Sequence, residues 1–226
     1  MKTVRLVATV LSGTITRKSN LLTLAAFGMA ALLGAIVASA APPSQSGFDA
    51  EITQHAQTMI EEGRKIFRYD TFGSEAFWGD ALQLHKAIAG EKNAGIGPGV
   101  SPKAALSVGL KVDADALPNA LKEQLAAGKV NLDDPATTIA LLKLNAVVGV
   151  TAFANPDGSV KGMGIQCAFC HSTVDDSFAP GIGKRLDGWP NRDLNVGAIV
   201  SLAPNLKPFT DLLGVDAETV KKVFAT

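Results

Sequence analysis

The sequence has few of the side chains that bind metals or carry redox chemistry. Its 226 residues include two cysteines, three histidines, four methionines and one tyrosine. It also has no internal repeat, no run of like charges and no low-complexity segment. These absences argue against a repeat architecture and against a compositionally biased chain.

An excess of basic charge is missing as well. The chain has 21 Lys+Arg and 21 Asp+Glu, and the first 40 residues hold four of the bases and none of the acids. Residues 41–226 therefore carry four more acidic than basic side chains. Because basic patches dominate affinity for nucleic acid, no nucleic-acid partner is expected. The same segment is long enough for one compact domain.

The N-terminus has the pattern of an export signal. Four basic residues lie within residues 1–20, and an uncharged apolar stretch, residues 21–40, ends in Ala38-Ser39-Ala40. This pattern predicts a secretory signal peptide, residues 1–40, cut after Ala40. The alternative is an uncleaved membrane anchor, because the apolar stretch approaches the length that spans a bilayer. Either way the folded part is expected in the periplasm, with membrane attachment only if the segment is retained.

The two cysteines lie three residues apart, and a histidine follows the second. The stretch GIQCAFCH contains Cys167, Cys170 and His171. Cys-x-x-Cys-His is the attachment signature of a c-type haem, in which both thiols bond to the porphyrin and the histidine ligates the iron. The sequence therefore predicts one covalent haem c, with Cys167, Cys170 and His171 as its binding residues.

Other chemistry also uses paired cysteines. A thioredoxin-like dithiol places Cys-x-x-Cys at a helix N-terminus, and zinc could recruit both thiols with His171. Adjacent Cys170 and His171 rarely both reach one tetrahedral zinc ion. The stretch before Cys167, NPDGSVKGMG, is predicted as turn, whereas the dithiol proteins place a strand there. A structural disulfide remains a further alternative.

The motif and the residues after it resemble the haem-binding part of class I c-type cytochromes. The resemblance covers Cys167 to His171, then Pro180-Gly181 and a loop with Trp189. A wider pattern, from residues 63–85 to the motif region, is similar to periplasmic single-haem cytochromes related to the cytochrome c peroxidase-like proteins. The resemblance implies a mostly α, cytochrome c-like helical fold around the haem, with long ordered loops and an extra N-terminal helical lobe.

The same resemblance implies further roles around the haem. It makes His171 the proximal iron ligand, and it gives the carbonyl of Pro180 to the other ring nitrogen of His171, which would fix the tautomer. Trp189, Arg185 and Lys184 become candidates to bind or neutralise the haem propionates.

Helical periodicity and proline positions predict the elements. We expect one haem domain over residues 41–226, with a helical lobe at 41–150 and a lobe bearing the motif at 151–226. A glycine-rich stretch, residues 90–102, is predicted as a plain loop, because Pro98 interrupts it and no strand precedes it. Helices are expected at 49–67, 75–89, 102–108, 118–127, 135–147, 194–203, 205–213 and 217–224.

The second iron ligand is where the sequence departs from class I cytochromes, which place a methionine downstream of the motif. Residues 172–226 contain no methionine, histidine or tyrosine. The candidates are His55, Met59, His85, Met163 and Lys207. Met163 lies too near Cys167 to reach the opposite haem face. His85 is favoured, because a histidine on an apolar helix face needs a hydrogen-bond or metal partner.

The ligand decides the function. With both axial positions filled, the protein is predicted to be a non-enzymatic carrier of single electrons between periplasmic redox proteins. An open sixth position would instead suit a haem enzyme of the peroxidase-like type, with Arg68, Tyr69 and Asp70 as candidate distal groups. A periplasmic thiol-disulfide oxidoreductase is the third hypothesis.

Overall fold

A computed structural model describes residues 47–225 of the chain. The predicted signal segment, residues 1–40, lies outside the described residues. The chain divides into two units, residues 1–55 and 56–226. Among the described residues, the first helix begins in the first unit, and every strand and every later helix belongs to the second unit. Among residues 47–225, no helix has both the length and the apolar composition that a bilayer span requires.

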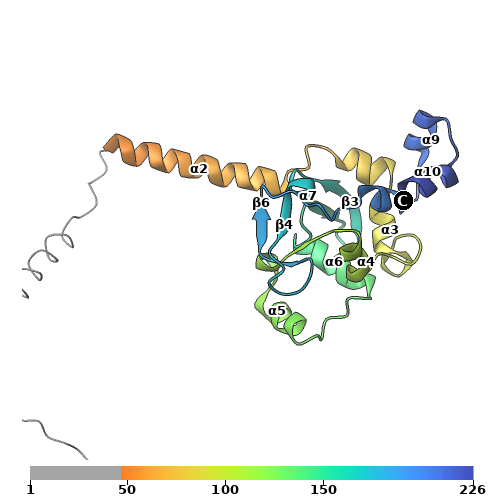
Figure 1. The fold of residues 1–226 in the computed structure, drawn as a ribbon, viewed down its shortest axis with the longest axis horizontal. Coiled ribbons are helices and arrows are strands. Elements are labelled where there is room, and N and C mark those ends of the chain that lie inside the picture. The colour runs from red at the N-terminus through yellow and green to blue at the C-terminus, as the bar shows by residue number, and fades with distance from the viewer. Residues whose placement is uncertain (1–46, 226) are drawn as a thin grey trace, which may run out of the picture. The chain divides into compact units, whose positions relative to one another are not determined.

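Most helices are short, and Figure 1 shows their arrangement. They are α2 (Gly47–Tyr69), the π-helix η1 (Ala76–Ala81), α3 (Leu84–Ala89), the 3₁₀ turns η2 (Glu91–Asn93) and η3 (Ala114–Ala116), α4 (Pro102–Ser107), α5 (Asn119–Ala126), α6 (Pro135–Lys143), α7 (Ala168–His171), α8 (Val196–Ser201), α9 (Lys207–Leu213) and α10 (Ala217–Phe224).

Three small sheets accompany these helices in the described part of the chain. The strands are β1 (Val112–Asp113), β2 (Val150–Ala154), β3 (Val160–Ile165), β4 (Ser172–Val174), β5 (Ile182–Gly183) and β6 (Arg185–Asp187). β1 pairs in parallel with β5, and β2–β3 and β4–β6 are antiparallel pairs. With about 50% helix and 13% strand, the fold is mixed α/β. The expectation of a mostly α fold is wrong, and the architecture is not clearly that of a cytochrome c.

Side-chain caps explain where several helices begin. Ser101, Asp134, Asn195 and Asp216 each accept a hydrogen bond from a backbone N–H of the first turn that follows. Such caps satisfy amides that have no partner within the helix. Helices were predicted at 102–108, 135–147, 194–203 and 217–224, and each is present, although three of the four are shorter than expected.

The helix predicted over residues 75–89 is broken in two. The π-helix η1 ends at Ala81, and α3 starts at Leu84. Between them Gln83 has a φ of 56° in the left-handed region, where no α-helix continues. The apolar periodicity passes through this break, which is why the sequence predicted one helix.

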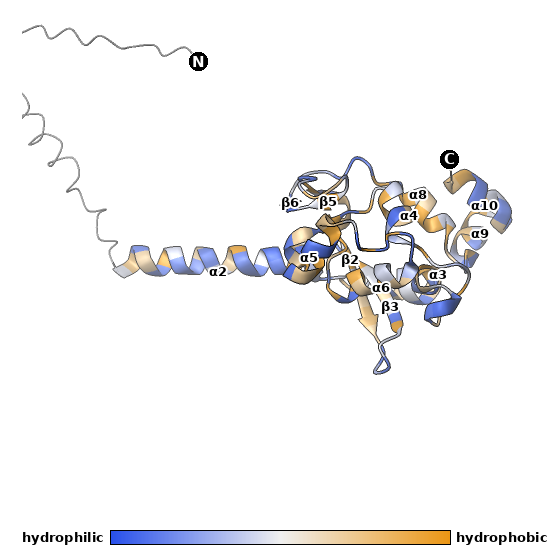
Figure 2. Ribbon diagram, turned by 90° about the horizontal axis from the view of Figure 1, so that it is seen from below, coloured by the Kyte–Doolittle hydropathy of each residue, from blue (hydrophilic) through white to orange (hydrophobic). Residues whose placement is uncertain are grey.

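The stretch before the motif is a β-hairpin. Asn155 to Ser159 form its turn, where N–H of Asn155 donates to the carbonyl of Ser159 over 2.8 Å. Val160 to Ile165 then form β3, so the prediction of turn holds only for the first half of NPDGSVKGMG. In Figure 2 hydrophobic colour on the strands changes to hydrophilic colour at the tip of the hairpin.

The core of the second unit lies where α3, α6, α8 and the β2–β3 hairpin meet. Its buried members include Leu82, Leu84, Leu142, Val150 and Ile199. The apolar stripe predicted on the first helix does not belong to it, because α2 contains no buried residue. Met59, for example, is 60% exposed.

Candidate functional site

The Cys-x-x-Cys-His motif forms a single helical turn. Cys167 is the residue before α7, and Cys170 and His171 are the last two residues of the helix. Positions i, i+3 and i+4 share one face of a helix, and all three side chains are exposed. Ala168 and Phe169 lie on the other face and are buried. Both cysteines are free thiols.

The loop after β6 holds the outer end of this turn. The carbonyl of His171 accepts a hydrogen bond from N–H of Gly188 (2.8 Å), and the carbonyl of Cys170 accepts one from N–H of Asn191 (2.9 Å). Trp189 lies between these two contacts, and it is 63% exposed. The predicted haem-contacting tryptophan is therefore next to the motif turn in the structure.

The inner side of the turn rests on a glycine. Gly149 has a φ of +79°, and a Cβ built on it would lie 2.1 Å from Cα of Phe169. Only glycine permits both this conformation and this approach. The carbonyl of Gly149 also accepts a hydrogen bond from N–H of Gln166 over 3.1 Å. The motif turn is thus fixed from both sides through backbone contacts.

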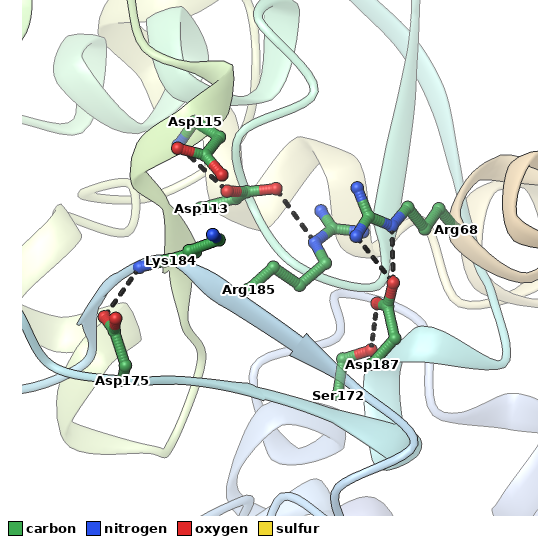
Figure 3. Close-up of polar contacts among 8 residues, drawn as sticks. All are labelled: Arg68, Asp113, Asp115, Ser172, Asp175, Lys184, Arg185 and Asp187. Carbon is green, nitrogen blue, oxygen red and sulfur yellow. Dashed lines mark hydrogen bonds and ion pairs between the residues drawn. The ribbon is translucent and has the colours of Figure 1, made fainter. Parts of the chain in front are cut away.

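An ion pair between Arg68 and Asp187 lies beside Ser172, as Figure 3 shows. The carboxylate of Asp187 accepts hydrogen bonds from Nε of Arg68 (2.7 Å) and from the hydroxyl of Ser172 (2.9 Å). Ser172 follows His171 in the chain, and Nη2 of Arg68 lies 2.6 Å from the same carboxylate. Arg68 was considered a candidate distal group, and in the structure it is bound to Asp187.

A second ion pair is fully buried. Nε of Arg185 lies 3.0 Å from Oδ2 of Asp113, and the two side chains are 2% and 3% exposed. The guanidinium also lies over the ring of Tyr69, 5.9 Å from its centroid. Nε and Nη1 of Arg185 have no hydrogen-bond partner among the described residues, although Nε lies in the ion pair with Asp113. Arg185 was predicted to bind a propionate, and Nη1 is a donor that could do so.

The loop between β4 and β5 contains Pro180. Pro180 is exposed, and within the described chain no hydrogen bond joins its carbonyl to His171. Asp175 organises the loop by accepting hydrogen bonds from the backbone N–H groups of Ser177 and Lys184. Hydrogen bonds from Ser177, followed by that from Lys184, lower the pKa of the Asp175 carboxyl. Lys184 itself is exposed.

His85 lies in α3, and it is 8% exposed. Its Nδ1 atom is buried and has no hydrogen-bond partner within residues 47–225. Burial lowers the pKa of the imidazole, and the nearby charge of Lys86 lowers it further. The structure therefore confirms that His85 lies on a buried face of its helix.

The other candidate iron ligands are dispersed. His55 and Met59 are exposed on α2, and Met163 is 3% exposed in β3. Lys207 forms an ion pair with Asp211 one turn along α9, at 2.7 Å. In the described part of the chain, no three His, Cys, Asp or Glu side chains form a group that could hold a metal ion. The site consists of the motif turn and its supports.

Several residues that support the site could not be recognised from the sequence, because their residue types are common and no known motif contains them. They are Gly149, Gln166, Asp113 and Asp187. Gln166 is 5% exposed, and its amide donates a short hydrogen bond to the hydroxyl of Thr151. Its position immediately before Cys167 was the one hint that it belongs to the site.

Comparison of the chain with protein-family models, with curated proteins and with solved structures gave no match. The chemistry of the motif turn is therefore the basis for a functional assignment.

Proposed function

We propose that the protein is an exported c-type cytochrome that carries single electrons between periplasmic redox partners. Cys167 and Cys170 would bond covalently to one haem, and His171 would be its proximal iron ligand. The observation that carries the proposal is the shared outward face of these three side chains on one helical turn. A haem bound there would supply a ferric/ferrous couple whose potential depends on its ligands and burial.

The chain's own residues would position this group. Backbone hydrogen bonds from Gly188 and Asn191 hold the turn that bears the thiols and the imidazole. Trp189 offers an exposed aromatic surface beside that turn. Nη1 of Arg185 and the exposed Lys184 are the candidate partners for propionates. Pro180 as a hydrogen-bond partner of His171 remains a prediction.

His85 as the second iron ligand also remains a prediction. The unpartnered Nδ1 atom supports it, since a buried imidazole nitrogen without a partner is costly. The haem enzyme gains no support, because Arg68 is held in its ion pair with Asp187.

One observation favours a thiol-disulfide oxidoreductase as the second candidate. β3 ends at Ile165, two residues before Cys167, which precedes a helical turn, and both thiols are free and exposed. Such a strand-to-helix junction is where dithiol enzymes place their cysteines. Here, however, the strand belongs to an antiparallel hairpin, and the helix has four residues.

The test is covalent haem attachment in a bacterial host that exports the full chain and has haem-attachment machinery. Haem staining after denaturing electrophoresis should label the wild type and the control variant Thr173→Ser. Staining should be lost when Cys167 and Cys170 are both replaced by alanine. A natively matured chain without added haem, whose two thiols interconvert with a disulfide, would refute the cytochrome and support the oxidoreductase.

The second ligand is tested by spectroscopy of the His85→Ala variant. If His85 binds the iron, the wild type should be low-spin and bind carbon monoxide poorly, because no axial position is open. The variant should then become high-spin or bind carbon monoxide. An unchanged spectrum in a folded variant would remove His85 from the site.

A further inference from the structure

A cavity of about 390 Å³ lies beneath α5, and neither the motif nor its supporting residues line it. Its floor is the parallel β1–β5 pair, where Val112 and Ile182 face each other in register. These two residues are 6% and 2% exposed. The cavity is large enough for a small organic molecule, because such sites begin at roughly 300 Å³.

One wall of the cavity is an incompletely buried helix. α5 contains no buried residue, yet Leu121 and Leu125 line the cavity and pack against the core. They lie four residues apart, on one helix face. Leu117, which is 4% exposed, extends this apolar surface toward the floor. An apolar molecule in the cavity would complete the burial of this helix face.

The rim of the cavity is polar and carries one charged side chain, that of Lys129, with Gln124 and Asn131 beside it. Lys129 follows a Schellman turn: Gly128 has a φ of +65°, its N–H donates to the carbonyl of Leu125, and N–H of Lys129 donates to the carbonyl of Gln124. This turn fixes the backbone of Lys129 at the end of α5.

Two acids close in sequence to Asn131 already have partners. Asp133 forms an ion pair with Lys103 over 3.3 Å, and Asp134 accepts a hydrogen bond from N–H of Ala136 at the start of α6. Lys129 forms no ion pair within residues 47–225. The mouth of an apolar cavity thus presents one unpaired positive charge.

From this combination we propose that the cavity binds a single-chain amphiphile with a carboxylate head, such as a medium-chain fatty acid. The tail would lie against Leu121, Leu125 and Ile182, and the carboxylate would lie at Lys129. The proposal is independent of haem binding, because it uses no residue of the motif turn.

The experiment is calorimetric titration of the purified full chain with decanoate, decan-1-ol and decylamine below their micellar concentrations. Decanoate should bind one site and bind tighter than decanol, and decylamine should bind weakest. Lys129→Ala should weaken decanoate binding about three- to tenfold and leave decanol unchanged. Lys122→Ala, the same change at a lysine of α5 that does not line the cavity, should have no effect.

A cavity-filling variant tests the location. Leu121→Trp should weaken decanoate and decanol more than about tenfold. Should this variant fail to fold, amide chemical shifts of the wild type give the same answer: decanoate should shift Leu121, Leu125 and Ile182. No saturable binding, equal affinity for all three amphiphiles, shifts outside the cavity, or displacement of decanoate by phosphatidylglycerol vesicles would each overturn the proposal.

Discussion

At the scale of single residues, the contact between Gly149 and Phe169 determines how closely the motif turn can approach the hairpin. Replacing Gly149 by alanine should lower the free energy of unfolding by roughly 2–5 kcal/mol, because a Cβ would both clash with Phe169 and occupy the left-handed region. Urea unfolding would measure the change. Gly73→Ala is the control, since Gly73 has a φ of +78° but no atom within 4 Å of a Cβ. Gly73→Ala should lower the free energy of unfolding by only about 1–2 kcal/mol. Equal decreases for the two variants would show that the contact with Phe169 does not matter.

The buried pair of Arg185 and Asp113 gives a second prediction at this scale. Arg185→Met should cost about 3–5 kcal/mol of unfolding free energy, because it leaves a buried carboxylate without its counter-ion. The double variant with Asp113→Asn should lose less than the sum of the two single variants. Urea unfolding of the wild type, the two single variants and the double variant would give the four free energies of this double-mutant cycle. Strictly additive losses would show that the two side chains do not depend on each other.

At the scale of elements, helices were easier to predict from the sequence than strands. The starts of α4 and α6 can be predicted because each has a capping residue followed by proline. These signals are local, since they act within one helical turn. β1 and β5 have two residues each, too few to show alternation. β3 contains two glycines, which are typical of turns. Its strand conformation comes from pairing with β2, which no local pattern records.

The start of α10 provides a pH-dependent prediction. Hydrogen bonds from the backbone N–H and the hydroxyl of Thr219 lower the pKa of the Asp216 carboxyl. The unfolded chain therefore binds a proton at a higher pH than the folded chain. Stability from this cap is present above the ordinary aspartate pKa of about 3.9 and is lost as the pH falls below it. Amide exchange at Thr219 should accelerate in that range relative to the rest of α10.

The matched variant for this element is Asp216→Ala. Its Thr219 amide should exchange faster than that of the wild type at neutral pH, and acid should add no further acceleration specific to the cap. If the Thr219 amide of the wild type were equally protected above and below the pH at which the Asp216 carboxyl titrates, the cap would not depend on the charge of Asp216.

At the scale of the whole molecule, the sequence predicted the grouping of the motif residues better than it predicted the fold. Cys167, Cys170 and His171 form one local turn, so five consecutive residues predict their grouping. The fold class came from a resemblance, and the strand pairs contradict it. The β1–β5 pair joins segments about 70 residues apart, and the Asp113–Arg185 ion pair crosses the same distance. Such contacts depend on the complete chain, and one sequence read locally does not predict them.

Net charge gives a prediction for the electron carrier that we propose. Without residues 1–40 the chain has four more acidic than basic side chains, and haem propionates would add negative charge. Electron transfer with cationic tris(phenanthroline)cobalt should therefore slow several-fold as salt rises, and with ferricyanide it should accelerate, since salt screens attraction and repulsion alike. Stopped-flow absorbance would give both rates. The same sign of salt dependence for both reagents would contradict a charge-controlled encounter.

The hydrogen bonds from Gly188 and Asn191 to the motif turn also bear on the order of events during biogenesis. A chain that leaves a membrane channel from its N-terminus presents its thiols about 20 residues before the segment that later immobilises them. If the chain is exported as proposed, the turn would lack these two hydrogen bonds for that interval, although Gly149 and the β2–β3 hairpin precede it in the chain. Cys167 and Cys170 would then be accessible to a maturation enzyme from the outer side of the turn. Once the loop after β6 has emerged, its hydrogen bonds to the turn would end this period of greater access.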